Sequence, residues 1–235
     1  LLFNFEKKYF EKENVSCEFV GHPLLQNKER SKIDINQIIG KNKALISVFA
    51  GSRKSEILVL MPILLDFIKL MNEKYTDMTY VFHSTREYSD LIKSFINESN
   101  ILNCEIVSDD KIKSHILQKS VFAVAKSGTV SLEISNAKIP SIILYKMGII
   151  NFMIVKSLIK TKYANIINFA ANEEIIPELL QSNCNSKNIF KHVSNFLEDP
   201  NKIKEQVSRV QSILDKLKIN GSSSELASLS LNKFL

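Results

Sequence analysis

A Ser-Gly-Thr turn with a carboxylate four residues beyond it is the first candidate site in this sequence. Ser127, Gly128 and Thr129 follow a run of small and apolar residues and precede a short predicted helix. A strand that turns into a helix leaves backbone N–H groups unpaired, and these amides and the helix dipole favour a phosphate or pyrophosphate. Gly128 has no Cβ and lets the backbone approach such a ligand closely. Glu133 lies on the same helical face as Thr129 and could bind two ribose hydroxyls. The alternative is a capped helix with a solvated glutamate, because short Ser-Gly-Thr turns are common.

A second candidate loop, Gly51-Ser52-Arg53, ends another apolar strand. The Arg53 guanidinium could bind two phosphate oxygens and offset the charge on a leaving pyrophosphate. A surface arginine paired with Glu56, three residues further on, is the alternative interpretation. The sequence has no GxSxG, Walker lysine loop or GxGxxG motif, which argues against serine hydrolases, P-loop hydrolases and simple dinucleotide oxidoreductases. Two such loops at one sheet edge together favour a pyrophosphate site.

Strands that alternate with helices are expected to position both loops. The predicted strands are Ala44–Phe49, Thr79–Phe82, Cys104–Val107, Val121–Ala125 and Ser141–Tyr145, and the helices between them are Ser55–Lys74, Glu87–Asn97, Lys111–Gln118 and Val130–Ala137. This alternation predicts an α/β fold, a doubly wound parallel sheet with right-handed crossovers. Ligands of such sheets bind beyond the carboxyl ends of the strands, where both loops lie.

The segments that flank the sheet are expected to be mainly helical. Those before it are a helix at Phe5–Lys12, a strand at Cys17–Val20 and a short helix at Asn36–Ile39. Those after it are a helix at Met147–Lys162, a loop at Asn165–Asn172, a helix opened by Pro177, and helices at Ser186–Leu197, Asn201–Leu217 and Ser223–Phe234. Lysines toward the end of the apolar run Met147–Lys162 suit either a buried helix or a helix on a membrane surface. His22 is interpreted as a turn histidine before Pro23, with ligand binding as the alternative.

The composition is that of a soluble globular protein of 235 residues, with 45% hydrophobic and 24% charged residues. A net charge of +6 suits anionic ligands or an anionic membrane surface, whereas no basic helix or aromatic-basic motif indicates a nucleic-acid partner. Cys17, Cys104 and Cys184 are far apart, which argues against a metal site or disulfide framework and fits a reducing cytoplasm. No apolar run reaches the roughly 18 to 20 residues that span a bilayer.

Taken together, these motifs resemble those of the lipid-A-disaccharide synthases, bacterial glycosyltransferases of the GT-B architecture. The matching segments are the FEKKYFEK opening, Gly21-His22-Pro23, Gly51-Ser52-Arg53 with Glu56, Ser127-Gly128-Thr129 with Leu132-Glu133, Pro140, Tyr145-Lys146, Val155–Tyr163, Asn168 and Ile176–Gln181. They correspond to the family's carboxyl-terminal, nucleotide-binding half, and we expect the amino-terminal, acceptor-binding half to be missing. Ala50, Ile167 and Asn172 replace the family's usual Pro, Pro and Gly, but none of these changes removes a reacting group.

The resemblance implies a Rossmann-like nucleotide-binding domain at residues 41–199, preceded at 1–40 by a linker with a remnant of the amino-terminal domain and followed at 200–235 by carboxyl-terminal helices. It implies transfer of diacylglucosamine from UDP-diacylglucosamine to diacylglucosamine 1-phosphate (lipid X), which yields the disaccharide 1-phosphate and UDP. It also implies a bacterial cytoplasmic protein that associates peripherally with the inner membrane, a homodimer, and no metal or other cofactor.

The resemblance also assigns roles to residues. Gly51, Ser52 and Arg53 would face the diphosphate, and Ser127, Gly128 and Thr129 would supply amides and hydroxyls. Glu133 would hold the ribose, and Asn168 would lie in the loop near the donor. Further members of the matched motifs, expected in the donor site without an assigned role, are Glu56, Glu178 and Gln181. The family's general base lies in the missing half, so no residue here is designated catalytic.

Two other functions stay open. One is another GT-B enzyme that uses a UDP-sugar, such as the peptidoglycan N-acetylglucosaminyltransferase or a UDP-N-acetylglucosamine epimerase. The other is an inactive fragment that only binds UDP.

Overall fold

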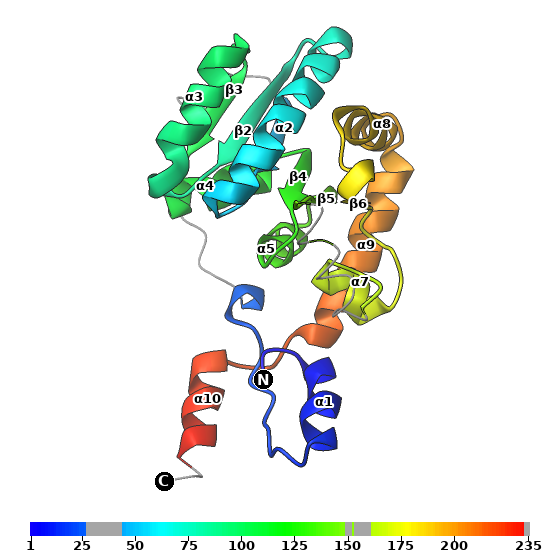
Figure 1. Ribbon diagram of the computed structural model, residues 1–235. Helices are drawn as coiled ribbons and strands as arrows, with labels where there is room; N and C mark the ends of the chain where they lie inside the picture. The colour runs from blue at the N-terminus through cyan, green and yellow to red at the C-terminus, as the bar shows by residue number, and fades with distance from the viewer. Residues whose placement is uncertain (27–43, 149–151, 153–160, 233–235) are drawn as a thin grey trace.

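A parallel sheet of six strands forms the centre of the protein (Figure 1). The computed structural model describes residues 1–26, 44–148, 152 and 161–232. The strands are β1 (Ala44–Phe49), β2 (Met78–His83), β3 (Cys104–Val107), β4 (Phe122–Lys126), β5 (Ser141–Tyr145) and β6 (Glu178–Leu180). All neighbours pair in parallel, in the order β3-β2-β1-β4-β5-β6. The strand order therefore reverses between β1 and β4.

Helices connect the strands and cover both faces of the sheet. The α-helices are α1 (Lys7–Lys12), α2 (Lys54–Lys74), α3 (Ser89–Ser99), α4 (Asp110–Lys119), α5 (Val130–Asn136), α7 (Ile166–Ala171), α8 (Ser186–Leu197), α9 (Pro200–Leu217) and α10 (Ser223–Leu231). Short 3-10 turns occur at η1 (Asn4–Glu6), η2 (Pro23–Leu25), η4 (Arg86–Tyr88) and η5 (Gln181–Asn183).

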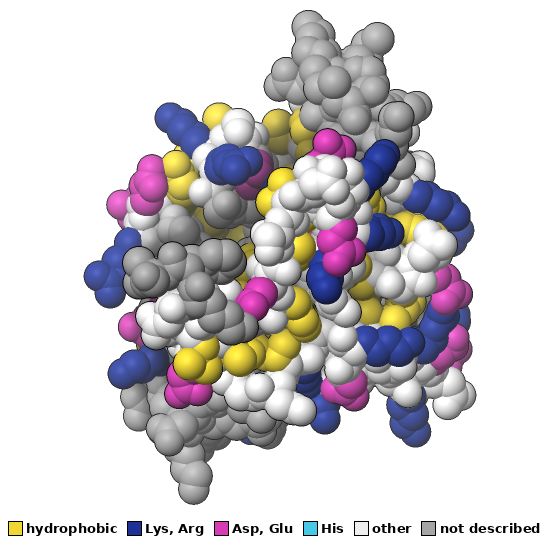
Figure 2. All heavy atoms as spheres, turned by 90° about the horizontal axis from the view of Figure 1, so that it is seen from below, with side chains coloured by type: hydrophobic (Ala, Val, Ile, Leu, Met, Phe, Trp, Pro, Cys, Tyr) yellow, Lys and Arg dark blue, Asp and Glu magenta, His cyan; other side chains and the backbone are white. Residues whose placement is uncertain are grey.

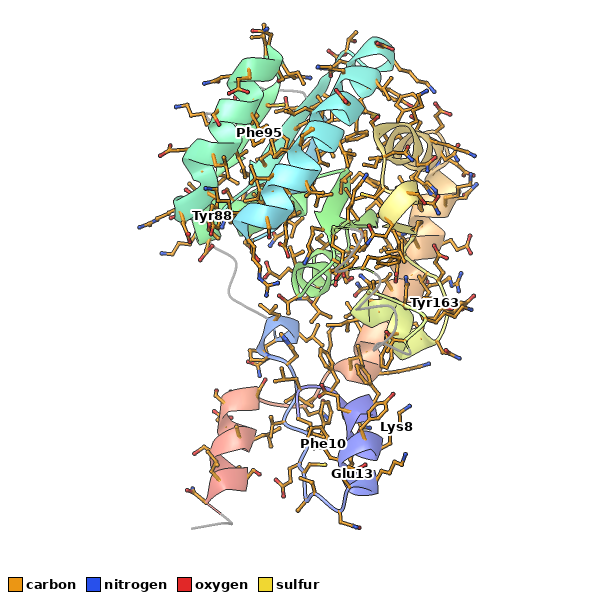
Figure 3. The ribbon with its side chains drawn as sticks, viewed as in Figure 1. Lys8, Phe10, Glu13, Tyr88, Phe95 and Tyr163 are labelled. Atoms are coloured by element: carbon orange, nitrogen blue, oxygen red, sulfur yellow. The ribbon has the colours of Figure 1, made fainter. Side chains whose placement is uncertain are left out.

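Two hydrophobic cores lie on opposite faces of the sheet because successive strand residues point to opposite sides. On β4, Val124 packs with α2, α3 and α8, whereas Ala123 and Ala125 pack with α5, α7 and α9. Tyr88 and Phe95, labelled in Figure 3, are partly buried residues at the start and middle of the α3 region that pack against the first core. The sheet is covered on both faces, as its nearly continuous apolar strands require.

The predicted doubly wound α/β fold is confirmed. The bounds of β1, β3, β5 and α8 are those predicted. Those of β2 and β4 differ by one residue at each end, and that of α2 differs by one residue at its start. The predicted helix Asn36–Ile39, most of Met147–Lys162 and the end of Ser223–Phe234 lie outside the described residues.

Three predicted elements are wrong. Cys17–Val20 forms no strand, although two main-chain hydrogen bonds link it to Leu1: the Val20 N–H donates to Leu1 O at 3.0 Å, and the Leu1 amino group donates to Glu18 O at 2.6 Å. The predicted loop at Asn165–Asn172 contains helix α7, which the Asn165 side chain caps. Pro177 opens no helix: its carbonyl accepts from Ile143 N–H at 2.9 Å, and edge strand β6 follows it. Pro is tolerated there because it need not donate to the ladder at the edge of a sheet.

The two ends of the chain meet below the sheet, where α1 and α10 lie in Figure 1. The Gln26 side chain donates to Ser223 Oγ at 2.7 Å, and Gly21 contacts Ile219 closely. Seen from below, this end of the molecule shows hydrophobic side chains among charged ones (Figure 2). Within the described part of the chain, no helix combines the length and apolar character needed to cross a membrane.

Candidate functional site

Both predicted loops lie at the point where the strand order reverses. Gly51-Ser52-Arg53 follows β1 and Ser127-Gly128-Thr129 follows β4, and these strands are neighbours with Phe49 beside Ala125. In doubly wound sheets this switch point opens a crevice beyond the carboxyl ends of the strands, which is where ligands bind. The sequence motifs therefore lie together at this edge of the sheet, and we call the position between the two loops the switch crevice.

Several of the predicted ligand residues are exposed at this edge. Ser52, Arg53, Gly128, Thr129 and Glu133 are all exposed, and the Arg53 side chain is 79% accessible. A Cβ placed on Gly128 would meet no atom of the described residues within 4 Å. Packing within the protein therefore gives no reason for glycine at position 128, whereas close approach of a ligand does.

Glu56, in the first turn of α2, lies beneath the first loop rather than facing the crevice. Its carboxylate accepts the Ser52 N–H at 3.0 Å, lies 2.7 Å from Lys126 Nζ and 3.7 Å from Arg53 Nη1. Burial raises the pKa of this carboxyl, but the hydrogen bonds from Lys126 and Ser52 and the two positive charges outweigh burial and hold the pKa below its ordinary value. Glu56 thus joins the first loop to the end of β4.

Gly51 explains how the loop fits over this carboxylate. Its φ is +117°, a conformation that residues with a side chain rarely adopt. A Cβ on Gly51 would lie 2.6 Å from Glu56 Oε2 and 2.7 Å from Glu56 Cβ. Glycine is therefore required at position 51 by both backbone and packing.

A second carboxylate, that of Glu178, accepts hydrogen bonds from the chain segment on the other side of the crevice. Glu178, the first residue of β6, accepts the N–H groups of Ala164 and Asn165 at 2.8 and 3.0 Å. The Ala164 carbonyl in turn accepts the Ser127 hydroxyl at 2.8 Å. Glu178 therefore positions the chain segment against which the Ser-Gly-Thr turn rests.

Asn168 is fully buried and all of its amide is used inside the fold. Its Oδ1 accepts from Ile175 and Ile176 N–H, both at 2.9 Å, and its Nδ2 donates to Ile176 O at 2.7 Å and Glu178 Oε1 at 2.8 Å. Its side chain holds the turn between α7 and β6 and supports Glu178.

Gln181 lies just after β6 with a φ of +50°. Its Oε1 is 3.4 Å from Met147 N, and its buried Nε2 has no hydrogen-bond partner among the described residues. The predicted residues thus differ in exposure. The exposed ones are Ser52, Arg53, Gly128, Thr129 and Glu133, and the buried or partly buried ones are Gly51, Glu56, Ser127, Asn168, Glu178 and Gln181.

The residue that sequence reasoning missed at this site is Lys126. It is the last residue of β4, directly before the Ser-Gly-Thr turn, and it pairs with Glu56. The one available signal was a lysine that ends an otherwise apolar strand.

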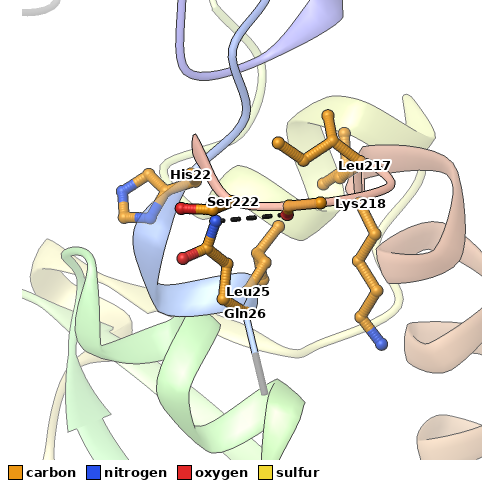
Figure 4. Close-up of a pocket in the computed structure, with 8 residues that line it drawn as sticks. His22, Leu25, Gln26, Leu217, Lys218 and Ser222 are labelled. Atoms are coloured by element: carbon orange, nitrogen blue, oxygen red, sulfur yellow. Dashed lines mark hydrogen bonds between the residues drawn. The ribbon is translucent and has the colours of Figure 1, made fainter. Parts of the chain in front are cut away.

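The described residues also line an open pocket of about 410 Å³ away from the crevice, between His22 to Gln26 and the segment that follows α9 (Figure 4). His22 lines it and confirms the interpretation as a turn histidine, since its Nδ1 accepts the Leu24 N–H at 3.1 Å. Burial lowers the pKa of this imidazole, and the Glu6 carboxylate partly opposes that effect. In the close-up, the His22 ring and the Lys218 side chain extend to opposite sides, so their polar atoms do not converge.

Solved structures share this fold at low sequence identity. A Staphylococcus aureus structure described as an MnaA-UDP co-structure superposes with a TM-score of 0.69 at 14% identity, and covers 99% of this chain and 58% of that chain. The carboxyl-terminal domain of a group 1 glycosyltransferase, LpcC, from Francisella tularensis superposes with a TM-score of 0.55 at 15% identity, and covers 84% of this chain and 97% of that chain.

The matches by sequence identify the family more closely than the structural matches do. Residues 1–231 match the family described as lipid-A-disaccharide synthetase. The lipid-A-disaccharide synthase of Rickettsia prowazekii is 36% identical over 220 residues, which is 92% of this chain and 57% of the relative. The enzyme of Sulfurihydrogenibium is 31% identical, over 89% of this chain and 57% of the relative. The chain thus spans little more than half the length of these relatives, and by these matches it belongs to the lipid-A-disaccharide synthase family.

Proposed function

We propose that this chain is the donor-binding half of a lipid-A-disaccharide synthase, with residues 41–199 as the UDP-sugar domain. The observation that carries this proposal is the placement of Gly51-Ser52-Arg53 and Ser127-Gly128-Thr129 on the two sides of the switch crevice. A sugar nucleotide bound there would set its diphosphate between the two turns and its ribose toward Glu133, which is exposed on α5.

The proposed reaction transfers diacylglucosamine to lipid X. The acceptor hydroxyl oxygen forms a bond to the anomeric carbon of the sugar, and the bond from that carbon to the diphosphate oxygen breaks. UDP leaves with the electron pair, and the hydroxyl proton passes to a base that this chain does not supply. Arg53 stabilises the charge that develops on UDP, because a guanidinium can bind two phosphate oxygens.

The proposal that the chain binds the donor is tested by titrating it with UDP in a calorimeter. We expect Arg53→Ala and Glu133→Ala each to weaken binding about tenfold or more, since a hydrogen bond to a charged group contributes about 1.5–3 kcal/mol. Lys69→Ala is a matched control, an exposed cation on α2 whose neighbour is Asp66. Unchanged affinity in both site variants would refute the proposed donor site.

Gly128→Ala tests close approach to the second turn. The added methyl group enters open space, so the stability of the fold should change little. If the diphosphate lies against this backbone, UDP binding should nevertheless fall severalfold or more. Normal UDP affinity in a normally folded Gly128→Ala protein would remove the second turn from the site.

We also propose that the chain alone binds UDP weakly and turns over little or no lipid, because the base lies elsewhere. Incubation with UDP-diacylglucosamine and lipid X, followed by separation of the lipids, tests this. Formation of the disaccharide would contradict it. Parallel reactions with non-acylated UDP-N-acetylglucosamine distinguish a different UDP-sugar enzyme.

Peripheral membrane binding and a homodimer complete the proposed function. Helix α1 supports membrane association, because it carries exposed Tyr9 and Phe10 together with the exposed Lys7, Lys8 and Lys12. We expect co-sedimentation with anionic vesicles that declines with salt and is weaker for neutral vesicles. Sedimentation velocity of the chain measures the dimer directly, and a monomer at all concentrations would contradict it.

A further inference from the structure

We propose that Lys126 is a diphosphate-binding residue at the floor of the switch crevice, and that Glu56 is the positioning residue that holds its ammonium group there. This inference rests on the proposed donor site and adds a cation that the matched motifs do not contain.

The geometry places Lys126 between the two turns. It ends β4, next to Ser127, yet its Nζ lies 2.7 Å from Glu56 Oε1, on the opposite side of the strand-order reversal. The other oxygen of Glu56 accepts the Ser52 N–H. The ammonium group therefore lies under the first loop while its backbone leads into the second, and a diphosphate held by both turns would lie over it.

The Lys126 ammonium group keeps donors available for such a ligand. Lysine has three N–H donors, and among the described residues the ammonium pairs with Glu56 and lies 5.6 Å from the centre of the Tyr145 ring. The ring holds the side chain by a cation–π contact and accepts no strong hydrogen bond. The side chain is still 21% accessible, so a phosphate oxygen can reach it.

The Lys126 charge is also less exposed to solvent than that of Arg53. The Arg53 side chain is 79% accessible, and water and salt screen its charge. A charge at 21% accessibility acts through a less polar surrounding, in which the same separation gives a larger interaction energy. We therefore expect the diphosphate to depend on Lys126 at least as strongly as on Arg53.

Glu56 acts through Lys126 rather than on the ligand. Both of its oxygens are occupied by protein donors, and its side chain is only 13% accessible. Without the carboxylate, the four-carbon stem of Lys126 would be free to rotate, and its contribution to binding would fall with the entropy of ordering it.

The experiment titrates the wild-type chain and its variants with UDP, and follows uridine binding by NMR. Lys126→Met should weaken UDP binding about ten- to hundredfold. Uridine, which carries no phosphate, should bind within about threefold of the wild-type value, a selectivity that a merely structural role would not produce. Lys126→Arg should restore most of the UDP affinity, which also covers the case in which the methionine variant folds poorly. Lys69→Met is the matched control, because it removes an exposed lysine on α2 whose neighbour is Asp66.

A double-mutant cycle tests the role of Glu56. If Glu56 positions Lys126, then Lys126→Met should cost much less UDP affinity in a Glu56→Gln background than in the wild type. An equal loss in both backgrounds would overturn the positioning role. Normal UDP affinity in Lys126→Met, with binding weakened by Arg53→Ala, would overturn the role of Lys126 and leave the donor site standing. Failure of the wild type to bind UDP would overturn both.

Discussion

Replacement of Gly51 by alanine should destabilise the protein through one identifiable contact. The φ of +117° at this position is one that alanine adopts only with strain. The new methyl carbon would lie 2.6 Å from Glu56 Oε2 and 2.7 Å from Glu56 Cβ. The carboxylate could rotate away, but the Cβ is fixed to the first turn of α2, so the loop or the helix must move.

The expected loss of stability follows from these two effects. Backbone strain of this kind costs about 1–3 kcal/mol, and forcing a methyl group into occupied space costs about 1–3 kcal/mol more. Displacement of Glu56 also weakens the Ser52 hydrogen bond, which contributes on the order of 1 kcal/mol. We therefore expect Gly51→Ala to lower the free energy of unfolding by about 3–7 kcal/mol, out of the roughly 5–15 kcal/mol typical of a domain.

Urea denaturation followed by circular dichroism measures this difference. Gly128→Ala is the matched control, because it adds the same methyl group to the other turn of the crevice, where no atom in the described part of the chain lies within 4 Å of it. Its free energy of unfolding should stay within about 1 kcal/mol of the wild type. Equal stability of Gly51→Ala and wild type, or an equal loss in both variants, would refute this account of the first loop.

Two buried polar groups give further predictions. His83 donates to or accepts from Ser47 at 2.8 Å, and burial, with a smaller effect of the Lys113 charge, lowers its pKa from 6.5 to about 3. The folded state thus keeps this imidazole neutral while the unfolded chain protonates it, so the free energy of unfolding should fall by up to about 1.4 kcal/mol per pH unit from pH 6.5 towards 3. Urea titrations at pH 6.5, 5.5 and 4.5 should show a flatter dependence for His83→Gln, and an unchanged slope would contradict this. Asn168→Asp should lower stability by about 3 kcal/mol or more, because it replaces an amide donor by a carboxylate facing Glu178 and a backbone carbonyl. Retention of wild-type stability at pH 7 would show that the network is not needed.

The sheet could be predicted from the sequence because its strands are strongly apolar and separated by helical periodicity. Residues Phe122 to Ala125 are fully buried between two layers of helices, and only a covered parallel strand explains such a run. The order of the strands in the sheet could not be predicted from the pattern of apolar residues. It depends on which strands pair, and this is decided by packing of the helices over the whole sheet.

The segment from Asn165 to Leu180 was missed because its elements are short. Helix α7 has six residues and β6 has three, too few for a periodic pattern to stand out. Local signals were nevertheless present: Asn165 caps the helix with its side chain, and Asn172 ends it with a φ of +52°. Asparagine is favoured at both of these helix-capping positions, so a search for capping residues could have predicted this helix.

At the site, sequence spacing identified the two turns but could not separate ligand contacts from internal ones. A carboxylate near a phosphate loop can accept hydrogen bonds from ribose hydroxyls or from the N–H groups of the protein itself. A glutamate in the sequence does not show which of the two it does. Glu133 is exposed on α5, and the partly buried Glu56 and Glu178 bind backbone N–H groups. That distinction depends on contacts to residues distant in sequence, such as Lys126.

The two internal carboxylates suggest why the crevice can hold its shape without a ligand. Glu56 draws Lys126, at the end of β4, against the first loop, and Glu178 fixes the segment whose carbonyl receives the Ser127 hydroxyl. Consecutive residues at the end of β4 are thereby anchored from opposite sides, one toward β1 and one toward β6. A turn held in this way does not have to be ordered by the diphosphate, so less of the binding energy is lost to ordering it. Loss of either carboxylate should accordingly weaken UDP binding, even though neither is expected to contact it.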